Sequence, residues 1–190
     1  MKVLGILGSP RVKGNTHLLL EAALKGAGEN GAETETILAD KIHVEPCREY
    51  YGCERDGNCV IRDDMDGIYP KLLAADVLLV ASPIFFYAVP AQLKLIIDRC
   101  QALWVRKHRL EMPMGAPGRK AGLICVGATS GEKLFYSTLY TMKYFFDAVD
   151  ADLNEKLLVR GVDERGAIKD HPEHLAAAYE MGKRLAPPAA

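Results

Sequence analysis

The sequence lacks an excess of charge of either sign. Lysine and arginine total 24 against 25 aspartates and glutamates in 190 residues, which leaves a formal net charge of −1. A field this weak argues against nucleic acid or an anionic membrane surface as the partner and favours small ligands. A signal-peptide pattern and an apolar run of bilayer-spanning length are also missing. We therefore expect a cytoplasmic protein, in which the five cysteines stay reduced.

Common nucleotide-binding and hydrolytic motifs are missing too. Gly5, Gly8 and Gly14 do not have the G-x-G-x-x-G spacing, and no Gly-Lys-Ser/Thr closes a Walker A loop. This disfavours a dinucleotide or a nucleoside triphosphate at the first loop. The five histidines are scattered, and neither a Ser-His-Asp nor a His-Glu-x-x-His arrangement is present. We find no internal repeat.

Patterns typical of strands and helices alternate along the chain. Apolar or alternating runs predict strands at 2–8, 32–38, 76–81, 120–127 and 153–160, and helical spacing predicts helices at 16–27, 64–73, 91–103, 133–148 and 172–185. Five such units predict an α/β fold, a flavodoxin-like doubly wound three-layer sandwich with a five-stranded parallel sheet. We expect one domain over residues 1–190, with a cysteine-containing loop at 41–63 and a frayed C-terminal tail at 186–190.

The loop at 8–16, between the first strand and the first helix, has the composition of an anion site. Its polar and glycine residues that we expect to hold an anion are Ser9, Arg11, Gly14, Asn15 and Thr16. A helix start offers free backbone N–H groups and the positive end of the helix dipole, and arginine can pair with phosphate. The alternative to an anion site is an ordinary strand-to-helix turn with solvated polar residues.

Two later loops follow predicted strands at the same edge of the sheet. The loop at 82–90 carries three consecutive aromatic residues, Phe85, Phe86 and Tyr87, which suit a flat ring lying against the loop or core filling beneath the next helix. The turn at 128–132 supplies hydroxyls and a flexible backbone. Ligands of such sheets bind outside the carboxyl ends of the strands, so we expect the three loops to converge.

The patterns Gly-Ser-Pro-Arg-x-x-Gly-Asn-Thr at 8–16 and Ser-Pro-Ile-Phe-Phe at 82–86 resemble the NADPH-dependent FMN reductase and iron-sulfur flavoprotein families. The resemblance implies bound FMN, which carries electrons from NAD(P)H to a flavin, a quinone, another small acceptor or a redox protein, without a catalytic side chain. It implies cofactor contacts from Ser9, Arg11, Gly14, Asn15, Thr16, Pro83, Ile84, Phe85, Phe86, Thr129, Ser130 and Gly131. It also implies a homodimer or homotetramer, for which Tyr136, Tyr140 and Tyr144 suit a contact.

The cysteine-containing loop resembles the compact cysteine motif of the iron-sulfur flavoproteins. Cys47, Cys53 and Cys59 are candidate metal ligands, but Tyr50 stands where that motif has its second cysteine. Because a [4Fe-4S] cluster as a rule takes four thiolates, this cofactor is possible but disfavoured. Four alternatives for the three cysteines stay open: they bind a cluster with a fourth ligand from outside the loop, they bind zinc, they act as redox-sensing thiols, or the loop has lost its metal. We expect the arginines nearby to lower a thiolate pKa.

Two further functions compete with the flavin reductase. One is an iron-sulfur flavoprotein or a flavodoxin-type electron carrier that does not oxidise NAD(P)H itself. The other is a non-catalytic nucleotide-binding or thiol-sensing module, in which Asp40 reads a ribose hydroxyl. The remaining cysteines, Cys100 and Cys125, lie on apolar faces and are expected to be buried as small hydrophobic residues.

Overall fold

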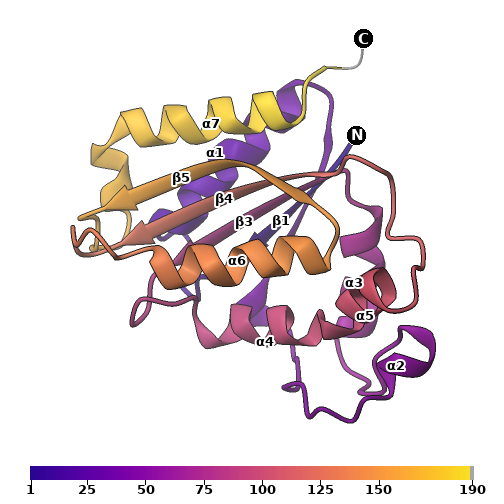
Figure 1. The fold of residues 1–190 in the computed structure, drawn as a ribbon. Helices are drawn as coiled ribbons and strands as arrows, with labels where there is room; N and C mark the ends of the chain where they lie inside the picture. The colour runs from indigo at the N-terminus through magenta and orange to yellow at the C-terminus, as the bar shows by residue number, and fades with distance from the viewer. Residues whose placement is uncertain (189–190) are drawn as a thin grey trace.

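The computed structural model describes residues 1–188 as a five-stranded sheet between two layers of helices (Figure 1). The strands are β1 (Lys2–Leu7), β2 (Glu33–Leu38), β3 (Val77–Pro83), β4 (Lys120–Gly127) and β5 (Asp152–Arg160). All neighbouring pairs are parallel, and the strand order is β2-β1-β3-β4-β5. This order confirms the flavodoxin-like doubly wound fold expected from the sequence.

Each face of the sheet is covered by its own helices and has its own apolar core. Helices α1 (Asn15–Glu29) and α7 (Pro172–Leu185) pack side by side on one face. Helices α3 (Met65–Ala74), α4 (Ala91–Arg99), α5 (Gln101–His108) and α6 (Tyr136–Ala148) lie on the other. Side chains of the central strand β3 point alternately into the two cores, which explains its unbroken apolar run.

The structure differs from the predicted elements at a few boundaries. The helix expected at 91–103 is interrupted at Cys100, whose N–H is shared between the carbonyls of Ile96 and Ile97, so that α4 and α5 are separate helices. The loop at 41–63 contains one short helix, α2 (Cys53–Asp56). Elsewhere the structure has two 3₁₀ turns that were not predicted, η1 (Ala39–Lys41) and η2 (Ala167–Asp170).

The C-terminal end is more ordered than we expected. Fraying does not begin at residue 186, because Ala186 is buried and its carbonyl accepts a hydrogen bond from the Asn30 side chain. The last two residues of the expected tail, 189 and 190, lie outside the described residues. Across residues 1–188, none of the helices combines the length and apolarity needed to cross a membrane.

Candidate functional site

A small pocket opens at the carboxyl ends of β1, β3 and β4. It encloses about 90 Å³. Its wall contains eight of the twelve expected cofactor residues: Ser9, Arg11, Gly14, Asn15, Thr16, Pro83, Ile84 and Phe85. Small-molecule pockets usually enclose roughly 300 Å³ or more, so this volume suits a phosphate-sized group rather than a whole flavin. We call it the phosphate pocket.

Backbone N–H groups at the start of α1 supply the donors of the phosphate pocket. In the described part of the chain no hydrogen bond occupies the amides of Asn15, Thr16 and His17, and no side chain caps the helix. Gly14 lies so close to the loop that an added Cβ would come 2.9 Å from the Arg11 carbonyl oxygen. Free amides, the helix dipole and the Arg11 guanidinium all favour an anion here.

Two polar side chains of the first loop, those of Asn15 and Ser9, form hydrogen bonds within the protein. The Asn15 amide donates to the carbonyl of Glu164 (2.9 Å), and its oxygen accepts from the N–H of Ile168 (3.1 Å). Asn15 therefore joins the first loop to the segment after β5 with its side chain, and has only its backbone amide left for a ligand. The hydroxyl of Ser9 accepts a hydrogen bond from the Arg11 amide (3.2 Å).

The aromatic residues at 85–87 form a tight turn at the rim of the phosphate pocket. Phe85 and Ala88 exchange two backbone hydrogen bonds of 2.9 Å, and the two residues between them have positive φ, 48° for Phe86 and 63° for Tyr87. This is the pattern of a type I′ turn, which normally needs Asn-Gly. Two bulky residues in a left-handed conformation make the turn strained. Phe86 is fully exposed, so it does not fill the core.

The third loop lines the phosphate pocket only through Ala128, and its expected cofactor residues lie outside the pocket wall. Thr129, Ser130 and Gly131 are exposed, and the Thr129 carbonyl accepts a hydrogen bond from the N–H of Gly161 (3.2 Å). The segment after β5 instead contributes Asp163 and Arg165 to the pocket wall. Sequence reasoning missed these two residues, although the fact that they follow the carboxyl end of a strand could have indicated them.

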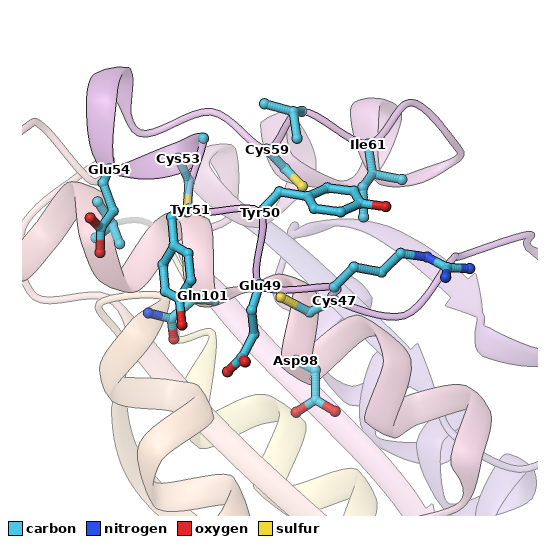
Figure 2. A pocket seen from close by; sticks show the side chains of 14 residues that line it. Cys47, Glu49, Tyr50, Tyr51, Cys53, Glu54, Cys59, Ile61, Asp98 and Gln101 are labelled. Carbon is cyan, nitrogen blue, oxygen red and sulfur yellow. The ribbon is translucent and has the colours of Figure 1, made fainter.

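A second and larger cavity, about 610 Å³, lies between the cysteine-containing loop and helices α4 and α5 (Figure 2). Cys47, Cys53 and Cys59 all line it, and all three are half-buried. Its wall also includes Asp98 and Gln101 from the two helices. We call it the cysteine pocket. It shares no lining residue with the phosphate pocket, and α2 lies at the opposite end of the molecule from the strand carboxyl ends (Figure 1).

A buried arginine holds both ends of the cysteine-containing loop. Arg99 at the end of α4 donates to the Glu45 carbonyl (2.9 Å) and to the Ile61 carbonyl (3.2 Å), and pairs with Asp63 at 2.5 Å. Both charged side chains of the pair are almost fully buried. Burial alone would raise the pKa of Asp63, but the Arg99 bond and the backbone amides outweigh it and the pKa is lowered.

The Cys53 thiol does not have the lowered pKa that we expected from the arginines. Burial raises the pKa of Cys53, and the nearby sulfurs of Cys59 and Cys47 raise it further. The arginines of the loop are already paired, Arg48 with Glu45 and Arg55 with Asp56, each at 3.1 Å. A guanidinium neutralised by a carboxylate gives little stabilisation to a thiolate. For Cys53 the expectation of a lowered pKa was wrong.

The other two cysteines are buried as predicted. Cys100 and Cys125 are 1% and 0% exposed. Burial raises the pKa of Cys125 to about 12 and that of Cys100 still higher. Neither thiol lines the cysteine pocket.

The donors in the cysteine pocket do not match a four-thiolate cluster. Three thiols line it, and the side chain of Tyr50 runs toward Ile61 with its hydroxyl at the end farther from the sulfurs (Figure 2). The only set of three His, Cys, Asp or Glu ligand atoms within 4.8 Å of one another in residues 1–188 is His171, Glu173 and His174, at the exposed start of α7. The three cysteine sulfurs are therefore more widely spread.

Comparison with known proteins places this chain among flavoproteins. The family model for NADPH-dependent FMN reductases matches residues 1–139. The chain is 48% identical over 130 residues to an iron-sulfur flavoprotein of Methanocaldococcus jannaschii (68% of this chain, 63% of the relative). It is 42% identical over 116 residues to the iron-sulfur flavoprotein of Methanosarcina thermophila (61% of each). The chain thus spans less than two thirds of the length of these relatives.

A solved structure agrees with the fold. The NAD(P)H:quinone oxidoreductase from Methanothermobacter marburgensis superimposes with a TM-score of 0.78 at 20% identity, covering 100% of this chain and 98% of that one. At this identity the likeness supports the fold, and the site has to be argued from this chain's own residues.

Proposed function

Because the chain belongs to the family of NADPH-dependent FMN reductases, we propose that it binds FMN and passes electrons from NAD(P)H to a flavin, a quinone or another small acceptor. The observation that supports this best is the phosphate pocket. It joins unoccupied amides at the start of α1, the Arg11 cation and the aromatic turn at 85–87 within one site. A monophosphate with an attached flat ring system matches these three features.

The residues of the chain bind and orient the cofactor. The amides of Asn15, Thr16 and His17 hold the phosphate, with the hydroxyls of Ser9 and Thr16 and the guanidinium of Arg11. FMN, when bound, would accept a hydride and release electrons one or two at a time. Ile84 and Phe85 at the rim of the pocket shield one edge of the ring system from water. No side-chain acid or base is required of the protein.

The exposed loop at 129–131 is proposed to border the pyrimidine edge of the flavin. Its position supports this role, because the Thr129 carbonyl accepts a hydrogen bond from Gly161 and Gly131 lies next to the Tyr87 hydroxyl of the aromatic turn. The phosphate end would thus be enclosed and the ring end open to a second substrate. An open ring face is what a reductase of small acceptors needs.

We further propose that the protein forms a homodimer or homotetramer through an aromatic surface beside this site. Tyr136, Tyr140 and Tyr144 on α6 are each more than half exposed. The Ser137 hydroxyl donates to the Tyr87 carbonyl, which joins α6 to the aromatic turn. Exposed aromatic side chains are enriched in interfaces between subunits. We also propose a cytoplasmic location, since all five cysteines are free thiols.

The test is an anaerobic purification followed by spectroscopy and turnover. We expect a yellow protein with stoichiometric FMN that oxidises NAD(P)H in the presence of a quinone or free flavin. If the protein binds FMN but does not oxidise NAD(P)H, it is an electron carrier and not a reductase. A colourless protein that cannot be reconstituted with FMN would overturn the proposal and favour a module that binds another nucleotide. In that reading Asp40 would face a ribose, whereas here it pairs with Lys41 at 2.9 Å and lies outside the phosphate pocket.

A further inference from the structure

We propose that the cysteine pocket binds an iron-sulfur cluster through only three protein thiolates, those of Cys47, Cys53 and Cys59, and leaves one iron to a ligand from solution. The proposal goes beyond the flavin function and does not depend on it. It starts from a disagreement: the relatives are called iron-sulfur flavoproteins, but this pocket lacks the donors of a four-cysteine cluster.

The three thiols are brought together by the fold. They lie within thirteen consecutive residues of one loop and line one cavity of about 610 Å³. Gly52, beside Cys53, contacts Val60, beside Cys59, so closely that an added Cβ would lie 2.2 Å from the valine side chain. Arg99 fixes the loop both before and after this contact. Half-buried thiols held in this way form a built site, unlike cysteines scattered on a mobile surface.

The spread of the sulfurs favours a cluster over a single metal ion. A tetrahedral zinc with bonds of about 2.3 Å requires its sulfur ligands to be roughly 3.8 Å apart. The three sulfurs of the cysteine pocket do not all lie within 4.8 Å of one another. In a cluster each thiolate binds a different iron, so the ligands stand farther apart. The large cavity also leaves room for a multi-atom group.

The fourth ligand position faces outward. Tyr50 is 64% exposed, and its hydroxyl points away from the three sulfurs (Figure 2). The residues on either side of it, Glu49 and Tyr51, have positive φ of 52° and 55°. Such a conformation is costly for residues with side chains, so the loop keeps Tyr50 turned outward against its backbone preference. Glu49 itself extends toward Asp98, on the far side of Cys47 from the other sulfurs (Figure 2).

The experiment uses the full chain, purified anaerobically and reconstituted with ferrous iron and sulfide. Bound iron and sulfide are assayed, and electron paramagnetic resonance and Mössbauer spectra are recorded with and without cyanide as the added ligand. We expect the wild type to bind iron and sulfide and its spectrum to shift with cyanide. Tyr50→Cys should bind at least as much iron and lose the cyanide shift. Cys47→Ser, Cys53→Ser and Cys59→Ser should each lose more than half of the iron.

Matched controls separate the site from the fold. Cys100→Ala and Cys125→Ala remove thiols outside the pocket and should keep the iron, and Glu49→Gln should keep the cyanide shift. The proposal is overturned if the wild type binds no iron, if iron survives loss of the three pocket thiols, if zinc displaces it on reconstitution, or if Glu49→Gln abolishes the shift. FMN content and NAD(P)H oxidation, measured on the same samples, show separately whether the flavin function holds.

Discussion

Among single residues, Arg11 provides the sharpest test of the phosphate pocket. It is the cation that the first loop contributes to the pocket wall, whereas Lys13, which is exposed like Arg11, lies outside the wall. A charge-assisted hydrogen bond contributes about 1.5 to 3 kcal/mol. Arg11→Gln should therefore weaken FMN binding by about 10-fold to 100-fold, as measured by quenching of flavin fluorescence. Lys13→Gln is the matched control, and equal losses in both variants would mean that only general charge matters.

The buried pair of Arg99 and Asp63 should govern stability. Asp63→Asn leaves the arginine charge buried without its partner, which typically costs about 3 to 5 kcal/mol. Asp66→Asn removes a carboxylate from the exposed pair with Arg62 and should cost about 1 kcal/mol or less. Urea unfolding at pH 7 measures both. Equal costs would show that the Asp63 pair is hydrated in solution.

The same pair predicts a pH dependence. Asp63 has a lowered pKa in the folded chain, so its contribution is fully present above the unfolded pKa of about 3.9 and is lost as pH falls through the folded value. Below about pH 4 the wild type should lose stability more steeply than Asp63→Asn. Unfolding curves at pH 7, 5 and 3.5 give the two slopes, and parallel slopes would contradict a lowered pKa.

Among the elements, the turn at Phe86 and Tyr87 is where we expect one substitution to raise protein stability and lower FMN affinity. Replacing the pair by Asn-Gly supplies the residues that a type I′ turn prefers, so the cofactor-free protein should be stabilised by about 1 to 2 kcal/mol. If these aromatics border the flavin, FMN affinity should fall in the same variant. Thermal unfolding and flavin titration measure the two effects. Phe86→Ala keeps the strained backbone and should weaken FMN binding without the gain in stability.

The helices and strands also show what the sequence could predict. All five strands were predicted to within two residues. The inner strands β1, β3 and β4 are covered on both faces and form continuous apolar runs, whereas the more exposed edge strands β2 and β5 were predicted from shorter or alternating apolar patterns. The break at Cys100 was not, since the helical spacing continues through it and only the sharing of its N–H reveals the interruption. The type I′ turn was also hidden, because Phe-Tyr carries none of the glycine or asparagine signals of such a turn.

At the scale of the molecule, the predictable part of the site is the part built from local sequence. The first loop lies between one strand and one helix, and five of its residues line the phosphate pocket. The cysteine pocket depends on Arg99, which is far from the cysteines in sequence and reaches both ends of their loop. These long-range bonds hold the two ends of the loop, and residues 47–59 alone could not predict them.

The proposed subunit contact concerns the whole molecule and can be tested directly. A surface that combines the α6 tyrosines with the aromatic turn would bury several large side chains when two copies meet, and lysine there would leave charge without water. The double variant Tyr140→Lys, Tyr144→Lys should therefore sediment as a smaller species than the wild type in analytical ultracentrifugation. Tyr51→Lys changes a tyrosine that is equally exposed but lies on the cysteine-containing loop, and it should sediment as the wild type does. If the double variant sediments with the mass of the wild type, or if Tyr51→Lys lowers the mass equally, α6 does not form the interface. Because the Ser137 contact joins α6 to the turn that borders the phosphate pocket, dissociation should also weaken FMN binding.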